Sequence, residues 1–194
     1  MMFKKNVFEI PVWHVNLQNN VNINEIENYC LQLEGKDNRV ISNEGGYQSQ
    51  DIDLDNAHEL KDLQNAIQIE SEKFSDSIGV KQCKIGNLWV NINNYLNSNQ
   101  AHRHANAILS GVFYGHSKFN EKSGDIMFRH PCTDYMAYNW DGIQTDEFSP
   151  TNSLSWTFEP HPCDLIIFPG WLEHRVEPNF AKDYKRISIS FNMS

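Results

Sequence analysis

From residue 83 onward the chain alternates short apolar segments with turn residues, and this pattern constrains the fold more than any other feature of the sequence. Closely spaced short strands are typical of a β-sandwich, a jelly roll or a barrel. We expect strands at 88–92, 108–114, 125–128, 154–158, 164–168, 172–176 and 186–192. Residues 83–194 are therefore predicted to form a β core.

The first part of the chain, residues 1–82, has a different pattern and is expected to cover that core. An extended strand is expected first, and apolar residues then recur at helical spacing in two segments, with a Gly-, Ser- and Asn-containing surface loop between them. The strand is expected at 8–13, the helices at 24–33 and 56–74, and the loop at 42–51. The prediction is a single domain spanning 1–194, mainly β with N-terminal helices (α+β).

The segment 132–153 is a long polar insertion in the predicted β core. Loops of this length inside a compact domain are usually functional lids or disordered segments. Its aromatic residues Tyr135, Tyr138 and Trp140 are candidates for a substrate-binding wall. They are equally compatible with a cap on the fold or with the contact of a homodimer.

Charge and composition exclude several classes of partner. With 16 Lys and Arg against 25 Asp and Glu the formal charge is −9, which disfavours binding to nucleic acid. The longest apolar runs have about five residues, whereas a membrane span needs roughly 20. The first ten residues show no export signal, and Cys30, Cys83, Cys132 and Cys163 are too far apart for a zinc CxxC pair. We therefore expect a cytoplasmic protein without a membrane segment.

His102 and His104 are the first candidate metal ligands. In a strand, residues i and i+2 point to the same face, so the two imidazoles can converge on one ion while Arg103 points away. Imidazole suits iron, copper, nickel and zinc. An HxH pair alone is also compatible with an ordinary polar strand end, so neighbouring residues have to decide.

His174 is the second clue, because its neighbours place it inside the protein. Glu173, Arg175 and Glu177 share one face of the predicted strand, and His174 lies on the other. A core histidine bonded to the backbone is the alternative, but three inward histidines on two strands favour a ligand set. The other histidines lack such a setting: His14, His58, His116, His130 and His161.

The last predicted strand has an apolar face and a polar face. The polar face contains Arg186 and Ser188, and it is either simply solvated or lines the mouth of a barrel. In the second case the Arg186 guanidinium suits a carboxylate, with the Ser188 hydroxyl as a further donor.

Together these elements resemble the iron(II)- and 2-oxoglutarate-dependent oxygenases, most closely their prolyl-hydroxylase-like branch. The resemblance extends over residues 89–192 and includes an uncharacterised group within the superfamily. The matching residues are Trp89, Asn91, His102, His104, Ser110, Gly111, Tyr114, Phe168, Pro169, His174, Val176, Arg186, Ser188, Phe191 and Asn192.

The resemblance implies a double-stranded β-helix, a cupin-like jelly roll whose open end holds Fe(II). By similarity, His102 and His174 would be iron ligands. Arg186 would bind the distal carboxylate of the co-substrate 2-oxoglutarate, assisted by Ser188 or Tyr114, and Tyr95 is a weaker candidate for the same pocket.

The sequence departs from the family pattern at His104, where an acidic residue is usual. Three interpretations stay open: a three-histidine site, a two-histidine site completed by water, or a carboxylate from elsewhere such as Asp125. We favour three histidines because the i+2 imidazole already faces the metal.

The function that the resemblance implies is oxidation, most commonly hydroxylation, of a small molecule, an amino acid or a peptide. One alternative is a cupin-like three-histidine metal enzyme that does not use 2-oxoglutarate, which would leave Arg186 without a purpose. The other is a non-catalytic jelly-roll protein with a binding or structural role, which would bind no metal.

Overall fold

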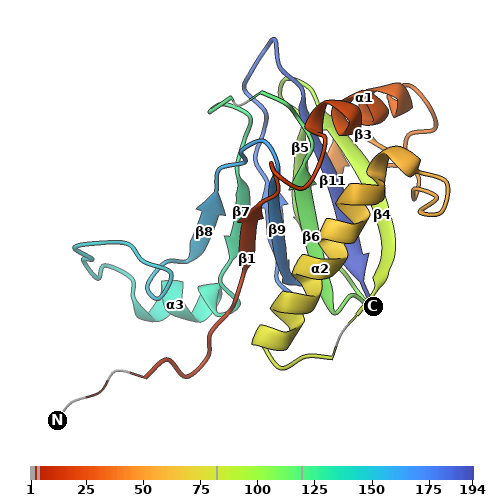
Figure 1. Cartoon of the computed structure of the whole chain (residues 1–194). Coiled ribbons are helices and arrows are strands. Elements are labelled where there is room, and N and C mark those ends of the chain that lie inside the picture. Colours follow the sequence, from red (N-terminus) through yellow and green to blue (C-terminus); the bar gives the residue numbers. More distant parts are fainter. Residues whose placement is uncertain (1–2, 4, 82, 119) are drawn as a thin grey trace.

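The computed structural model describes residues 3, 5–81, 83–118 and 120–194. Its strands form two antiparallel sheets that face each other (Figure 1). The larger sheet has the order β1-β9-β6-β11-β4-β3, and the smaller has the order β2-β5-β10-β7-β8. This is the mainly β arrangement of a double-stranded β-helix that the sequence predicts.

The strands of the larger sheet are β1 (Trp13–Asn16), β3 (Tyr47–Gln48), β4 (Ile85–Asn93), β6 (Leu109–Tyr114), β9 (Asp164–Pro169) and β11 (Arg186–Met193). Those of the smaller sheet are β2 (Asn43–Glu44), β5 (Ser98–His102), β7 (Ile126–Arg129), β8 (Ser155–Phe158) and β10 (His174–Val176). Most predicted strands of the β core are correct to within one or two residues, because short apolar segments between turn residues are typical of strands.

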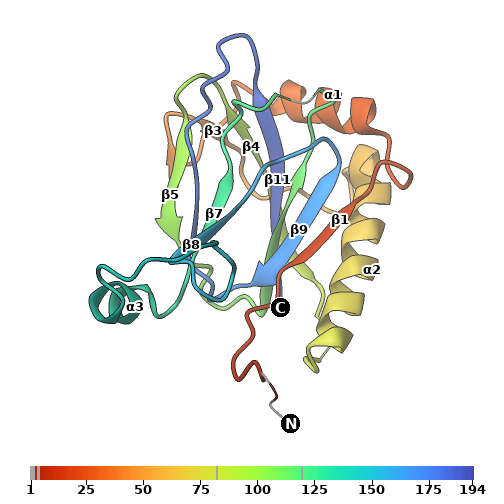
Figure 2. The same ribbon diagram turned by 90° about the vertical axis from the view of Figure 1, so that its left-hand side faces the viewer.

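Two helices, α1 (Ile23–Leu33) and α2 (Lys61–Ser77), cover the outer face of the larger sheet, as Figure 2 shows. Buried residues of α2 such as Leu63 and Ile67 share one apolar cluster with Ile189 and Phe191 of β11. The Asn22 side chain caps α1 by accepting a hydrogen bond from a backbone N–H of its first turn. A second apolar cluster, which includes Phe128 of β7, fills the space between the sheets.

The interpretation of 42–51 as a surface loop is wrong. The segment forms β2 and β3, which extend the smaller and the larger sheet, respectively. Asn43, Gln48 and Ser49 of this segment are buried, and the Asn43 side chain donates to the Gly46 carbonyl at 2.8 Å. The polar composition of 42–51 is typical of a loop. Its backbone nevertheless pairs with β5 and β4, so it forms strands.

Three other expectations need adjustment. The first strand begins at Trp13 rather than at residue 8, and a 3-10 turn (His58–Leu60) precedes α2 where a continuous helix was expected. The insertion 132–153 contains a short helix, α3 (Thr133–Asn139), which the sequence did not predict. Within the described residues, no helix is long and apolar enough to cross a bilayer.

Gly111 of β6 offers a test of how closely the larger sheet is packed. A Cβ atom there would overlap the Phe191 ring and lie 2.8 Å from the Ile166 carbonyl oxygen. We expect Gly111→Ala to lower the free energy of unfolding by about 1–3 kcal/mol, measured by denaturant titration. Gly115→Ala is the control, because its Cβ would meet Ile26 at an ordinary 3.4 Å. Equal stability of the two variants would contradict the packing described here.

Candidate active site

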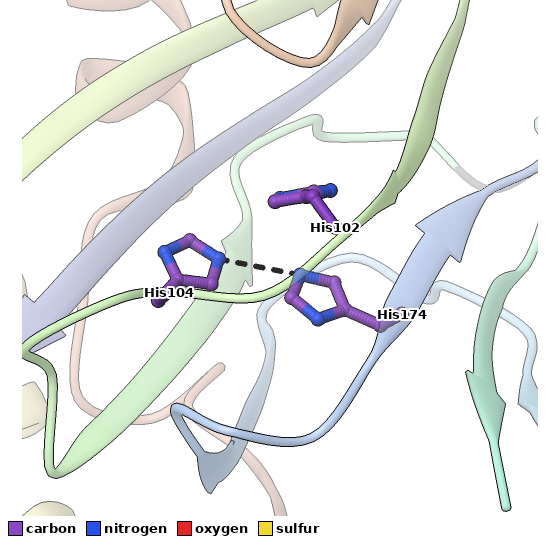
Figure 3. A group of neighbouring side chains, drawn as sticks. All are labelled: His102, His104 and His174. Carbon is purple, nitrogen blue, oxygen red and sulfur yellow. Dashed lines mark hydrogen bonds between the residues drawn. The ribbon is translucent and has the colours of Figure 1, made fainter.

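Three histidines converge between the two sheets (Figure 3). His102 ends β5 and His174 begins β10, and the pairing of these strands places the two residues directly opposite each other. His104 lies just beyond the end of β5, so it is not a strand residue as expected; its backbone N–H donates to the Gly170 carbonyl instead. The potential ligand nitrogens of all three rings lie within 4.8 Å of one another.

Backbone carbonyls fix the orientation of two of these rings. Nδ1 of His102 donates to the Gln100 carbonyl at 2.7 Å, and Nδ1 of His174 donates to the Leu172 carbonyl at 3.0 Å. A carbonyl oxygen only accepts hydrogen bonds, so each Nδ1 carries a proton, and the Nε2 of each neutral ring presents a lone pair. This arrangement is typical of metal-binding histidines.

The environment keeps the three rings neutral near pH 7. Burial lowers the pKa of His174 to about 3 and that of His104 to about 4, and in both cases repulsion from the neighbouring imidazoles adds to the effect. Burial also lowers the pKa of His102. Nε2 of His104 and Nε2 of His174 form a hydrogen bond at 3.3 Å (Figure 3), and because the proton of His174 is on Nδ1, Nε2 of His104 is the donor.

Among the described residues, no carboxylate joins this group of potential ligand atoms. Asp125, the remote carboxylate considered from the sequence, lies outside the group, and its neighbour Ile126 lines the cavity instead. A site with three nitrogens thus fits a transition metal better than Mg²⁺ or Ca²⁺, which prefer oxygen ligands.

Arg186 and Tyr114 line the same cavity from the larger sheet. Nη1 of Arg186 donates to the carbonyls of Ser123, at 2.5 Å, and Glu177, at 2.9 Å. Within the described residues, its Nη2 and the Tyr114 hydroxyl are both buried without a hydrogen-bond partner. Burial lowers the pKa of Arg186 to about 10 and raises that of Tyr114, so at pH 7 one is a cation and the other a neutral donor.

Buried hydrogen-bond donors without a partner are uncommon in proteins. Two such donors in one cavity make it a candidate anion-binding site. An unsatisfied buried polar group costs about 1–3 kcal/mol. Arg186 and Tyr114 together supply a charged and a neutral donor inside the cavity that also contains the three histidines. This donor pair fits a carboxylate group.

The other predicted site residues divide into two groups. Ser188 lines the cavity beside Arg186. Tyr95 does not line it: the Tyr95 ring is 40% exposed and lies beneath the Lys182 ammonium group. The aromatic residues of 132–153 also lie elsewhere, with Tyr135 and Tyr138 projecting into solvent.

Sequence reasoning missed Ser42 and Asn99, which line the cavity from the edge of the smaller sheet. Ser42 was missed because 42–51 resembles a loop in composition, and Asn99 lies on β5, which was not among the strands predicted. Asn91 of β4 carries a further unpartnered buried oxygen in this cavity. Asn91 is one of the residues that carry the family resemblance in the sequence.

Comparison with known families identifies the chain. Residues 87–192 match the sequence model of the family described as "Putative 2OG-Fe(II) oxygenase". The chain belongs to this family. This 2OG-Fe(II) oxygenase is accordingly an oxidoreductase that uses iron(II) and 2-oxoglutarate. No curated protein matches its sequence.

Solved structures of similar fold include several prolyl hydroxylases. A prolyl-4-hydroxylase from Pseudomonas putida has a TM-score of 0.65 at 14% identity, over 95% of this chain and 92% of that one. A prolyl hydroxylase from Trichoplax adhaerens, in complex with a hypoxia-inducible-factor peptide, has a TM-score of 0.64 at 13% identity, over 94% and 82%. The viral collagen prolyl hydroxylase of Paramecium bursaria Chlorella virus-1, solved with 2-oxoglutarate, has a TM-score of 0.58 at 11% identity, over 94% of each chain. At these identities the likeness shows the fold, a double-stranded β-helix.

The unpartnered Tyr114 hydroxyl makes a stability prediction. Tyr114→Phe removes a buried donor that has nothing to bind in the ligand-free protein, so the free energy of unfolding should rise by about 1 kcal/mol. Tyr184→Phe is the control, because its hydroxyl donates to the Lys118 carbonyl at 3.0 Å and its loss brings no gain. Denaturant titration without 2-oxoglutarate measures both variants. A destabilised Tyr114→Phe variant would mean that the protein itself satisfies this hydroxyl.

Proposed function

We propose that His102, His104 and His174 together hold the iron(II) ion of this oxygenase. The observation that carries the proposal is the convergence of their nitrogens within 4.8 Å, with the Nδ1 atoms of His102 and His174 tied to backbone carbonyls. Nε2 of His104 and Nε2 of His174 share one proton in a hydrogen bond, and a metal ion bound at the same point would replace that proton. The buried, neutral rings therefore favour a divalent ion over a proton.

Arg186 and Tyr114 are proposed to bind the distal carboxylate of 2-oxoglutarate. Nη2 of Arg186 and the Tyr114 hydroxyl are the unpartnered donors of the cavity, and Ser188 offers a further hydroxyl beside them. Contacts from Arg186 Nη1 to backbone carbonyls hold the guanidinium in place before the co-substrate arrives. Such preorganisation lowers the entropy cost of binding.

Iron held by His102, His104 and His174 would supply the oxidation of a substrate C–H bond by O2, of which one oxygen atom enters the substrate and the other enters succinate as 2-oxoglutarate loses carbon dioxide. The chain's own task is to orient the reactants and exclude water. Val112 and Phe168 form apolar walls of the cavity, and the Trp89 ring lies 5.8 Å from that of His104. These walls keep water away from the reacting atoms.

For the substrate we propose a small molecule, an amino acid or a peptide, with hydroxylation as the outcome. The formal charge of −9 disfavours nucleic acid, and the Trichoplax relative was solved with a peptide fragment. A cytoplasmic location agrees with the four free cysteines. A homodimer through the aromatic residues of 132–153 stays a prediction.

A cupin-like metal enzyme without 2-oxoglutarate is the less favoured alternative. Such an enzyme would need no arginine in the cavity, yet Arg186 is 1% exposed there with an unpartnered nitrogen. A purely structural role also leaves that nitrogen unexplained. The family match of residues 87–192 supports the oxygenase.

Substitutions of the histidines test the metal site. His104→Ala should weaken Fe(II) binding on the same scale as His102→Ala, whereas His104→Asp supplies a carboxylate ligand and should retain partial affinity. His174→Ala should abolish binding while the fold survives. Anaerobic calorimetry measures the affinities, and circular dichroism checks the fold. Parental affinity in His104→Ala would leave only two histidines as ligands.

A substitution of Arg186 tests the co-substrate site separately. Arg186→Gln should weaken 2-oxoglutarate binding while Fe(II) binding is retained, because a neutral amide loses a charge-assisted hydrogen bond of about 1.5–3 kcal/mol. That loss corresponds to roughly a 10- to 150-fold weaker affinity. Calorimetry on the metal-loaded protein measures it. Unchanged affinity would place the carboxylate of 2-oxoglutarate elsewhere.

The most direct test of the whole proposal needs no knowledge of the substrate. The purified protein, given Fe(II), ascorbate and 2-oxoglutarate, should release succinate slowly without any substrate added. The Arg186→Gln and His174→Ala variants serve as controls and should lose this release. Failure of the parent protein to bind Fe(II) or 2-oxoglutarate would refute the proposal.

A further inference from the structure

A second cavity, of about 240 Å³, lies on the β8 side of the molecule and has no role in the function proposed above. It lies between β8 of the smaller sheet and the segment that precedes β1. Its apolar walls are formed by Ile10, Val12, Phe128, Trp156, Phe158 and Leu172, and we call it the apolar cavity. Arg129 lines it as well, but its guanidinium is paired with Glu173 at 3.2 Å and with Asp134 at 2.6 Å.

Two phenylalanine rings separate the apolar cavity from the three histidines. Phe128 lines the apolar cavity, and Phe168 lines the cavity that contains the histidines, the iron-site cavity. The centroids of these two rings are 4.9 Å apart, and the Phe168 centroid lies 4.6 Å from that of the His174 ring. Phe128 is also the strand partner of His174 in the pairing of β7 with β10. The path from the apolar cavity to the proposed iron ligands therefore crosses the rings of Phe128 and Phe168.

The apolar cavity reaches the surface of the protein as well as the interior. Trp156 of β8 forms part of its wall and is 38% exposed, whereas Phe128 and Leu172 are buried. Pro150, from the insertion 132–153, lines the same cavity and is exposed. A small molecule can therefore enter the cavity beside β8 and the insertion and move inward as far as Phe128.

The lining of the apolar cavity suits a small apolar molecule. Apolar cavities stay free of water, and one of about 150 Å³ is large enough to bind xenon or benzene. O2 is the apolar reactant of an oxygenase. A substrate carbon in this cavity would be separated from the iron by two aromatic rings, so the cavity suits O2 better than it suits the oxidised part of the substrate.

The iron-site cavity offers O2 a poorer route. It is narrower, at about 40 Å³, and its lining includes the polar side chains of Asn91, Arg186 and Ser188. It is also the proposed binding site of 2-oxoglutarate. O2 that arrived through it would have to pass the bound co-substrate.

We propose that O2 collects in the apolar cavity and reaches the iron by passing the Phe128 ring. This inference rests on the proposed iron site of His102, His104 and His174. Side chains change rotamer even in a closely packed core, so movement of the Phe128 ring opens a passage for a diatomic molecule. Larger molecules stay outside, and the apolar lining keeps water out of the passage.

Xenon is the probe for the apolar cavity, because it is a small apolar atom and does not react. Methyl NMR of the metal-free protein under xenon pressure should show shifts for Ile10 and Leu172, which line the cavity, and none for Ile189, which packs beneath the helices. Val12→Phe places a ring in the cavity and should abolish these shifts. Val7→Phe is the matched control, because Val7 belongs to the same N-terminal segment but is 79% exposed and does not line the cavity.

The second experiment measures how the succinate release without substrate depends on O2 concentration. Val12→Phe should lower kcat/KM for O2 severalfold and leave kcat at saturating O2 unchanged, because a filled cavity slows the arrival of O2 but not the chemistry. Phe128→Leu removes a ring from the wall and should raise kcat/KM for O2. Val7→Phe should keep the parental values. Anaerobic calorimetry should show parental Fe(II) affinity in Val12→Phe, which separates O2 access from damage to the iron site.

The outcomes distinguish this proposal from the iron site on which it rests. Absence of xenon shifts in the parent, or an unchanged kcat/KM for O2 in Val12→Phe, overturns the role of the apolar cavity. A Phe128→Leu variant whose kcat/KM for O2 does not rise overturns the passage at Phe128. A parent that shows the xenon shifts but binds no Fe(II) refutes the iron site and, with it, the delivery of O2.

Discussion

The alternation of side chains along β11 is the constraint on which both the core and the candidate site depend. Ile187, Ile189 and Phe191 belong to the apolar cluster beneath the helices, while the residues between them face the other sheet. A slip of one residue in the pairing with β4 and β6 would exchange these faces. The same burial that stabilises the larger sheet therefore also directs Arg186 and Ser188 into the cavity.

The pairing of β10 with β5 in the smaller sheet positions the histidines of the candidate site. β10 lies beside β5 so that His174 is opposite His102, and the chain then leaves β5 and brings His104 back toward them. The smaller sheet and the residues just after β5 thus hold the imidazoles, and the larger sheet holds the unpartnered donors of Arg186 and Tyr114. Three neutral imidazoles leave the charge of a divalent ion uncompensated, whereas a carboxylate ligand would reduce it. The dianionic co-substrate is then the main source of compensating charge.

Periodicity along the chain was enough to predict part of the site, whereas features that depend on tertiary pairing were missed. The alternation around His174 and along 186–192 placed those residues inside, and the structure agrees. The segment 42–51 was misinterpreted because edge pairing, not composition, decided its structure. Tyr95 was misplaced because separation along the chain says little about the direction of a side chain in a turn.

The central claim is that three imidazoles, and no protein carboxylate, form the metal site. X-ray absorption spectroscopy of the Fe(II)-loaded protein measures this directly, because imidazole rings give a characteristic multiple-scattering signal that reports their number. The account predicts three imidazole ligands in the parent and two in His104→Ala. A parent spectrum with two imidazoles that is unchanged in His104→Ala would contradict it.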